Sequence, residues 1–242
     1  MIDLLADPVG AWLQLPGSAS AELVGSVGFG FVCVDQQHGL IGDDAVLPML
    51  QALAATGTPA LVRVTHNEPA AIGRALDRGA AGVIVPLVDS AEQTRAAVAA
   101  CRYPPDGGRS YGPTRVGWRD RRGGGAARPE PVCVVMIETV TAVAALPEIL
   151  AVPGLGGIFV GPSDLALSAG LPVTAQDGDP RFDALVDTVF GACGAAGIPV
   201  GIYCASAGHA QRFRARGATF TALLAEAAMR RAAAAAHLEA AR

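Results

Sequence analysis

The sequence predicts an α/β protein that folds as a single-domain (β/α)8 barrel, a TIM barrel, across residues 1–242. Short β-branched apolar runs alternate along the chain with alanine-rich helical stretches, which is the order of elements in folds with a parallel sheet. Eight such pairs in about 240 residues match the size of a TIM barrel. Doubly wound sheets share the alternation but usually stop at about five or six strands.

The predicted strands are eight short apolar runs. They contain few charged residues, as expected of parallel strands whose two faces are both buried. In chain order they are Ala11–Leu15, Phe31–Asp35, Ala60–Val64, Gly82–Val85, Cys133–Ile137, Gly157–Val160, Pro199–Tyr203 and Thr219–Leu223.

The predicted helices lie between and after these strands. Several end in a glycine followed by a small or apolar residue, as in Arg78-Gly79-Ala80, which is typical of a helix cap that leads directly into a strand. In chain order they are Ala19–Gly28, Asp44–Thr56, Pro69–Arg78, Ala91–Cys101, Val140–Leu150, Arg181–Ala196, Gly208–Arg216 and Ala225–Ala241.

Residues 102–131 interrupt this rhythm. The segment is rich in glycine, proline and arginine and has no strong periodicity. Loops of this length inside a compact domain are uncommon unless they are functional or disordered. We expect this segment to cross one end of the barrel and to shape the substrate pocket. Its part Gly123–Arg128 is either ordered there or solvated and partly disordered.

Composition limits the classes of partner. The formal net charge of -4 leaves no basic footprint for nucleic acid. No run of about 18 apolar residues predicts a membrane span, and the first ten residues lack the features of a signal peptide. The five cysteines have no metal-ligand spacing, which predicts buried, structural thiols and a cytoplasmic protein. The low charged fraction of 17% hints at surface buried in an oligomer.

Ionisable residues gather at the carboxyl ends of the predicted strands, where TIM barrels carry their active sites. Asp35 ends the second strand and His38 lies three residues further on. Arg63 lies on the third strand, and Glu138 follows the fifth. The sixth strand leads into Gly161-Pro162-Ser163-Asp164. These groups should therefore meet at one rim of the barrel.

Glu138 and Asp164 are the candidate metal ligands. Each directly follows an apolar strand, where an unpaired carboxylate would be costly to desolvate. Two oxygen ligands with open coordination positions suit Mg²⁺ or Mn²⁺. The alternative is that these carboxylates are helix caps, with Asp164 capping a following turn.

His38 is the candidate general acid or base, because imidazole titrates near neutrality. Asp35 could orient it or share its proton; alternatively, His38 is a surface residue and Asp35 a strand cap. Arg63 must face carboxylates or an anionic ligand, because a buried unpaired guanidinium is very unfavourable. It could therefore bind substrate or form a structural ion pair with Asp35 or Asp164.

Two further features could contribute to binding. The turn at Gly161, Pro162 and Ser163 presents backbone N–H groups that could receive a carboxylate or phosphate. Trp12 lies near the end of the first strand, where it either lines the pocket or packs in the core. The sequence has no phosphate-binding P-loop and no nucleophile elbow.

Several of these residues lie in motifs that resemble the HpcH/HpaI family of metal-dependent (class II) pyruvate aldolases. The resemblance covers most of the chain in the family's order. The matching stretches are GFGFVCVDQQHGL (28–40), PALVRVTHNEPAAIGRALDRGAAGVIVPLVDSAEQ (59–93), RYPPDGGRSYGP (102–113) and VVMIETVTAVAALPEILAVPGLGGIFVGPSDLALSAGLP (134–172).

The resemblance implies a set of roles. Glu138 and Asp164 would hold Mg²⁺, Mn²⁺ or Co²⁺, which would chelate the carboxylate and keto oxygen of pyruvate and stabilise its enolate as a Lewis acid. Arg63 would stabilise the charge on the keto oxygen. His38, assisted by Asp35 and a water on the metal, would move the proton of the aldol hydroxyl. Backbone amides near Ser163 would receive the carboxylate.

The family also implies partners. Its members act on small molecules, here pyruvate or another 2-oxo acid together with an aldehyde or other electrophile. They are typically homo-oligomers, a hexamer or trimer, in which the C-terminal helix is exchanged between subunits. Residues 225–241 are the corresponding segment.

Some residues depart from the family pattern and leave the acceptor open. Met136 stands where many of these aldolases have glutamine, and Gln36-Gln37 where many have Gly-Glu. The pattern V-C-V-D-x-Q-H-G-L is shared with proteins similar to macrophomate synthase. We therefore expect reversible aldol cleavage of a 2-oxo acid through a metal-bound pyruvate enolate. The alternatives are oxaloacetate decarboxylation or a biosynthetic C–C bond-forming step through the same enolate, and a catalytically silent scaffold.

Overall fold

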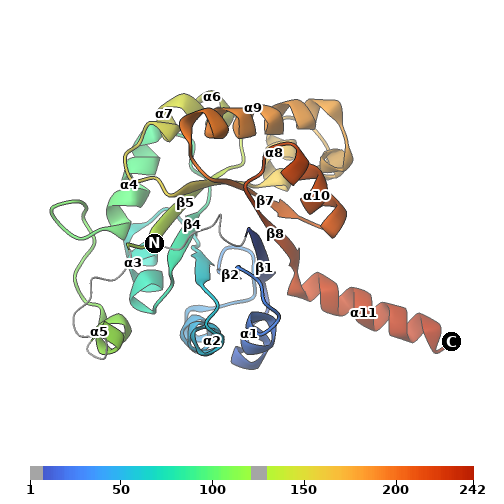
Figure 1. Cartoon of the computed structure of the whole chain (residues 1–242), viewed down its shortest axis with the longest axis horizontal. Coiled ribbons are helices and arrows are strands. Elements are labelled where there is room, and N and C mark those ends of the chain that lie inside the picture. Colours follow the sequence, from blue (N-terminus) through green and yellow to red (C-terminus); the bar gives the residue numbers. More distant parts are fainter. Residues whose placement is uncertain (1–7, 121–129) are drawn as a thin grey trace.

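The computed structural model, described for residues 8–120 and 130–242, is a closed barrel of eight parallel strands (Figure 1). Each strand pairs with its neighbours in chain order, and β8 closes the barrel against β1. The predicted TIM barrel is confirmed. The strands are β1 (Val9–Leu13), β2 (Phe31–Asp35), β3 (Ala60–Arg63), β4 (Gly82–Val85), β5 (Val132–Ile137), β6 (Gly157–Val160), β7 (Val200–Cys204) and β8 (Phe220–Ala225).

The helices surround the barrel, as Figure 1 shows, except for the last one, which extends away from it. They are α1 (Ser18–Gly25), α2 (Asp43–Thr56), α3 (Pro69–Asp77), α4 (Ala91–Cys101), α5 (Thr114–Asp120), α6 (Val140–Ala144), α7 (Leu146–Leu150), α8 (Pro162–Ser168), the short 3-10 helix η1 (Val173–Asp177), α9 (Pro180–Ala196), α10 (Ala207–Ala215) and α11 (Glu226–Ala240).

The predicted strands agree with the observed ones to within two residues at each end. The helix expected over Val140–Leu150 is two helices, α6 and α7, which meet around Ala145 just before Pro147. Proline lacks a backbone N–H and cannot continue the hydrogen-bond ladder of a preceding helix. Two further helices, α5 and α8, lie where a loop and a turn were expected.

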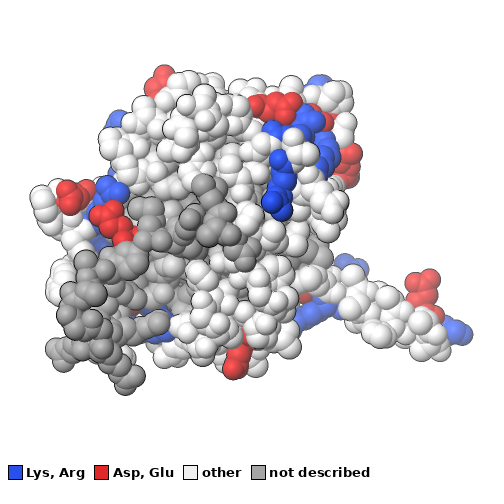
Figure 2. Space-filling model, viewed as in Figure 1, with Lys and Arg blue, Asp and Glu red and all other residues white. Residues whose placement is uncertain are grey.

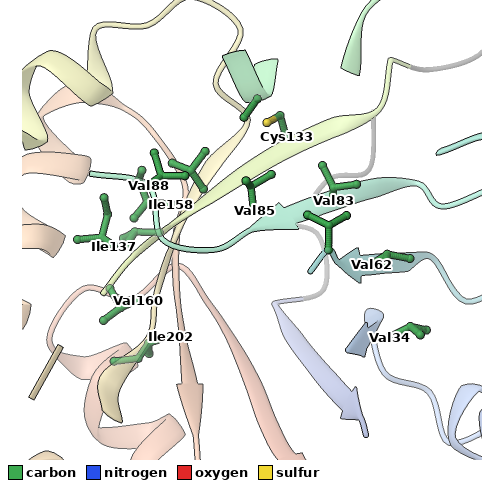
Figure 3. Close-up of a cluster of buried hydrophobic side chains, with 14 of the residues drawn as sticks. Val34, Val62, Val83, Val85, Val88, Cys133, Ile137, Ile158, Val160 and Ile202 are labelled. Atoms are coloured by element: carbon green, nitrogen blue, oxygen red, sulfur yellow. The ribbon is translucent and has the colours of Figure 1, made fainter. Parts of the chain in front are cut away.

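Alternation along the strands divides the core into two layers. Side chains on one face of each strand fill the barrel, and those on the other face pack against the helices. The inner layer consists of Trp12, Phe31, Cys33, Leu61, Ile84, Val132, Val134, Met136, Phe159, Phe220 and Ala222, with Tyr203 packed against it. Figure 3 shows part of the outer layer, including Val34, Val62, Val85, Ile137, Val160 and Ile202.

All five cysteines are buried and free, as predicted for structural thiols. Burial raises the pKa of Cys193 and that of Cys204 to about 12. Burial also holds the pKa of Cys33 well above its ordinary value. Buried thiols with raised pKa values are poor nucleophiles, so these side chains act as small apolar core residues.

Residues 102–120 and 130–131 lie at the amino ends of the strands. They connect the end of α4 to the start of β5, and in a βα barrel such connections lie opposite the face that carries the site. Ion pairs fix the segment there: Arg102 with Glu130 at 3.1 Å and Arg109 with Asp77 at 2.5 Å. The expectation that this segment shapes the substrate pocket is therefore wrong for its described part.

The stretch Gly123–Arg128, for which we left order and disorder open, lies outside the described residues. In the parts of the chain that are described, no helix is both long enough and apolar enough to cross a lipid bilayer.

Helix α11 is largely exposed along its length, and Figure 1 shows it projecting from the barrel. Figure 2 shows charged groups near both ends of this helix with an uncharged stretch between them, and a further group of charged side chains over α9 and α10. Those charges form ion pairs, such as Arg212 with Asp183 and Arg216 with Asp187. The exchange of α11 between subunits remains a prediction.

Candidate active site

A cavity of about 210 Å³ opens at the carboxyl ends of the strands. It contains most of the residues that the strand-end rule selected. All its lining residues together come from six strands and the segments that follow them. Its walls are Trp12, Gln14, His38, Arg63, Met136, Phe159, Gly161, Pro162, Ser163, Asp164 and Tyr203.

Asp35 and Arg63 form a buried bidentate ion pair beside this cavity. Neighbouring positions on β2 and β3 place them side by side. Arg63 Nε donates to Asp35 Oδ1 at 2.8 Å, and Arg63 Nη2 donates to Oδ2 at 2.6 Å. Trp12 Nε1 also donates to Asp35 Oδ2, and the guanidinium lies 5.0 Å from the Trp12 ring centre. The planar group is therefore held in one orientation, which a single hydrogen bond would not achieve.

The ionised state of Asp35 is maintained in spite of its burial. Burial opposes ionisation, but the hydrogen bonds and positive charge of Arg63 outweigh this effect, and the pKa of Asp35 lies below its ordinary value of 3.8. For Arg63, the sequence left open substrate binding or a structural ion pair with Asp35 or Asp164. Its structural partner is Asp35, and the guanidinium nevertheless lines the cavity.

His38 lies in the loop after β2 and is exposed at the cavity wall. Asp35 Oδ1 accepts the backbone N–H groups of Gln37 at 3.0 Å and of His38 at 3.3 Å. We expected Asp35 to orient the imidazole. Its described contacts are instead with Arg63, Trp12 and the backbone of this loop, so Asp35 positions the loop that carries His38.

Glu138 lies directly after β5 and is almost completely buried. Its Oε1 accepts the backbone N–H of Leu87 at 2.6 Å. Leu87 has φ of 54°, a left-handed conformation that is uncommon for leucine and is often found at functional sites. Burial and the negative charge of Asp164 raise the pKa of Glu138, while the Leu87 N–H and Arg63 lower it, and the net direction is upward.

Asp164 reaches the same rim from the first turn of α8, where its side chain is exposed. Glycine at position 161 makes the close approach of the two segments possible. A Cβ atom there would lie 2.7 Å from Glu138 Oε2, closer than real Cβ contacts, and 3.0 Å from Met136 Cε, which is tighter than most of them. The turn before α8 is therefore built to admit the Glu138 carboxylate.

The two carboxylates fit a divalent cation. They approach from adjacent strand ends, and their mutual repulsion contributes to the raised pKa of Glu138. Within the described residues, no group of three or more His, Cys, Asp or Glu side chains is arranged to hold a metal ion. A site with two protein carboxylates suits Mg²⁺, which keeps several waters and uses substrate oxygens as further ligands.

Aromatic and apolar side chains form the floor of the cavity. The Trp12 and Phe159 rings stack with centroids 5.3 Å apart, and Tyr203 meets Trp12 edge-on at 5.8 Å. Met136 also faces the cavity. Both readings of Trp12 therefore hold, because it packs in the inner core layer and also lines the pocket.

Gln14, Tyr203 and Glu226 are among the residues of this region that the sequence-based selection did not include. Gln14 and Tyr203 line the cavity. Glu226 follows β8 and binds the backbone of Gln14. The strand-end rule itself would have found them, because they end or follow the first, seventh and eighth strands.

Comparison with known proteins decides the family. The model of the HpcH/HpaI aldolase/citrate lyase family matches residues 9–231. The chain belongs to this family. A 2-dehydro-3,6-dideoxy-6-sulfogluconate aldolase from Pseudomonas putida is 36% identical over 95% of this chain and 90% of that protein. A hydroxypyruvate/pyruvate aldolase from Rhizorhabdus wittichii is 38% identical over 92% of this chain and 89% of its own length.

Solved structures agree. An HpcH/HpaI aldolase/citrate lyase family protein from Burkholderia cenocepacia superposes with a TM-score of 0.86, at 28% identity, covering 98% of this chain and 95% of that one. Macrophomate synthase superposes with a TM-score of 0.82, at 22% identity, covering 98% of this chain and 86% of its own, and this likeness concerns the fold.

The HpcH/HpaI protein described here is therefore an enzyme, an aldehyde-lyase that catalyses aldol cleavage of a 2-oxo acid. The alternative of a silent scaffold is set aside. The family includes aldolases that depend on a divalent metal, and its aldolases act on small molecules.

Proposed function

We propose that this enzyme makes and breaks the carbon–carbon bond between pyruvate and an aldehyde, through the pyruvate enolate and with a divalent cation. One observation carries the proposal: Asp164 and the fixed guanidinium of Arg63 line the cavity of about 210 Å³, and the Glu138 carboxylate lies close enough to both for their charges to act on its pKa. The relatives named as pyruvate aldolases support pyruvate as the donor.

Glu138 and Asp164 would hold the cation, which we propose to be Mg²⁺, Mn²⁺ or Co²⁺. When bound, it would supply Lewis-acid stabilisation of negative charge on the pyruvate oxygens. The Leu87 N–H would hold Glu138 in place, because it binds Oε1 and leaves Oε2 toward Gly161.

As the pH is lowered, the affinity for the cation should begin to fall at a higher pH than it would if Glu138 had the ordinary pKa of a glutamate. The pKa of Glu138 in the metal-free enzyme is raised above 4.5, and the protonated side chain cannot act as a ligand. The apparent affinity should decrease by about tenfold per pH unit below that raised pKa. Calorimetric titration with Mg²⁺ from pH 8 down to pH 4.5 measures this, and an unchanged affinity over that range would contradict the assignment of Glu138.

Arg63 and the start of α8 would bind the 2-oxo acid. The guanidinium cannot rotate freely, because Asp35 holds two of its nitrogens, so its cavity-facing edge is preorganised for the developing charge on the keto oxygen. The N–H groups of Ser163 and Asp164 lie in the first turn of a helix and have no intrahelical acceptors. With Gly161 and Pro162 they would form the wall that receives the substrate carboxylate, and Trp12 would close the opposite side.

His38 would move the proton of the aldol hydroxyl. In the cleavage direction the imidazole removes that proton, the bond between C3 and C4 breaks, and its electrons form the C2–C3 double bond of the enolate while the aldehyde leaves. The reverse sequence gives condensation. His38 lies on the cavity wall, and the loop that carries it is fixed through Asp35.

His38→Ala should slow the aldol step by about 10²–10⁴-fold, the usual contribution of a general acid or base. Exchange of the pyruvate methyl protons should fall by less, because enolate stabilisation depends on Arg63 and the cation. His66→Ala, which changes an exposed histidine outside the cavity, is the matched control. Equal losses in both reactions would argue against the role given to His38.

Decarboxylation of oxaloacetate, alone or coupled to a biosynthetic C–C bond-forming step, is the second candidate. It reaches the same enolate by loss of CO₂, so it needs no proton removal from an aldol hydroxyl. The phenyl and thioether groups of Phe159 and Met136 favour it over cleavage of a polyhydroxy acid, because these two side chains offer little hydrogen bonding to hydroxyls. If it is the native reaction, His38→Ala should leave decarboxylation nearly unchanged.

We further propose that residues 1–242 form one domain and that the enzyme is a cytoplasmic homo-oligomer, a hexamer or trimer. The exposed, alanine-rich helix α11, which extends from the barrel, supports exchange of this helix between subunits. The buried free cysteines support a reducing compartment.

A further inference from the structure

Glu226 is a buried carboxylate that the proposed reaction does not use. It follows β8 as the first residue of α11 and is 2% exposed. An ionised group in such a position is stable only when its oxygens are satisfied by hydrogen bonds.

The two carboxylate oxygens of Glu226 bind the segment after β1. Oε2 accepts two backbone N–H groups, from Gln14 at 2.9 Å and from Leu15 at 3.1 Å. Oε1 accepts the hydroxyl of Ser20 at 3.0 Å, and Arg230 Nη2 lies 3.8 Å from the same oxygen. The carboxylate thus ties the end of β1 and the start of α1 to the first turn of α11.

The segment held by Glu226 in turn supports the His38 loop. Leu40 donates its N–H to the carbonyl oxygen of Gln14 at 2.7 Å. Gly39 packs so tightly that a Cβ atom there would lie 2.2 Å from the Asp35 carbonyl oxygen and 3.2 Å from Gln14 Cα. His38 therefore lies between a residue bonded to Asp35 and a residue bonded to Gln14.

A continuous set of hydrogen bonds thus runs from the Glu226 carboxylate through the backbone of Gln14 to Leu40, two positions after His38. Gln14 is itself a wall of the cavity. We propose that Glu226 is a positioning residue, which fixes Gln14 and the His38 loop against the cavity without touching substrate or cation. That Glu226 fixes these two loops follows from the contacts alone. Its effect on the aldol step rests on the proposed role of His38.

This arrangement links helix α11 to the site. Glu226 begins α11, and Arg230 one turn later binds both Ser20 and Glu226. A displacement of the first turn of α11 would release the N–H groups of Gln14 and Leu15. A change in the position of α11 should therefore affect the side of the cavity that carries His38. Arg63 on β3, Glu138 after β5 and Asp164 on α8 are held by other elements.

The first test needs no activity. Native-state hydrogen exchange of Glu226→Ala, read at the amides of Gln14, Leu15 and Leu40, should be faster than in the wild type, while amides of β5 and β6 keep their protection. Glu239→Ala, which removes an exposed glutamate from the same helix, is the matched control. Unchanged protection at all three amides would overturn the proposal.

The second test separates positioning from general destabilisation. In Glu226→Ala the aldol turnover number should fall by about 10- to 100-fold, the effect expected from a misplaced catalytic group. Methyl exchange of pyruvate, the KM for pyruvate and Mg²⁺ affinity should stay close to the wild type. Glu226→Asp, which keeps a shorter carboxylate, should recover part of the lost turnover.

If Glu226→Ala does not fold, Glu226→Gln replaces it. Glutamine has one acceptor oxygen in place of two and no charge, so it cannot keep the bonds to Gln14, Leu15 and Ser20 as the carboxylate does, and the same pattern is expected with a smaller loss of turnover. Equal losses of turnover and methyl exchange in a folded variant would overturn the proposal, and so would full activity. If the wild type shows no metal-dependent methyl exchange, the proposed function fails instead. In that case the amide exchange still decides whether Glu226 holds the loops.

Discussion

Asp164→Ala should reduce metal-dependent turnover to the level measured with EDTA, while the barrel stays folded. The Asp164 side chain is exposed on the first turn of α8, so its removal leaves no buried cavity. It is, however, one of the two carboxylates proposed to hold the cation, whose stabilisation of negative charge is worth several kcal/mol. A loss of about a thousandfold or more is therefore expected, measured as steady-state turnover with Mg²⁺ or Mn²⁺.

The second carboxylate is best tested with Glu138→Gln, which keeps an oxygen for the Leu87 N–H. Calorimetry should show loss of Mg²⁺ binding in Glu138→Gln and Asp164→Ala alike. Glu148→Gln, a change at an exposed glutamate on α7, serves as the control and should bind and turn over normally. Normal turnover in either site variant without bound metal would refute the metal-assisted mechanism.

Asp35→Asn should destabilise the enzyme by about 3–5 kcal/mol and should also inactivate it. The substitution leaves Arg63 buried without its ion-pair partner, which is far more costly than losing both charges. At 242 residues this corresponds to a decrease in melting temperature of roughly 10 °C. Chemical and thermal unfolding measure the loss, and turnover reports the disorder of the guanidinium.

The double variant Asp35→Asn/Arg63→Met removes both charges and should recover much of that stability without recovering activity. The effect also has a defined pH dependence. Because the folded-state pKa of Asp35 lies below 3.8, its stabilisation is complete above that pH and is lost as the pH falls through the lowered pKa. The stability gap between wild type and Asp35→Asn should therefore be constant at neutral pH and narrow under acid conditions.

The barrel could be predicted because each strand has a strong local signature. Phe31–Asp35, Gly82–Val85 and Gly157–Val160 are apolar runs that begin at or just after a glycine and end before a glycine, a proline or a polar residue, and their observed limits are the predicted ones. The division of Val140–Leu150 into two helices was missed although Pro147 marks it in the sequence. The helix at Thr114–Asp120 was missed because its local sequence lacks an apolar stripe.

The site was predictable to the level of residues but not of contacts. The strand-end rule placed His38, Arg63 and Asp164 around one cavity. It could not show that the Asp35 side chain holds Arg63, since that depends on the register of β2 against β3. The position of Glu226 at the end of β8 can be read from the sequence, but its contact with the backbone of Gln14, 212 positions away, cannot. No local pattern records such a contact.

The most direct test of the central claim is proton–deuterium exchange at the methyl group of pyruvate, followed by NMR in D₂O. It reports formation of the enolate and does not require the acceptor to be known. With Mg²⁺ or Mn²⁺ the enzyme should exchange the methyl protons, EDTA should stop the exchange, and added metal should restore it. Absence of exchange with every metal, together with no decarboxylation of oxaloacetate, would contradict enolate chemistry at this site.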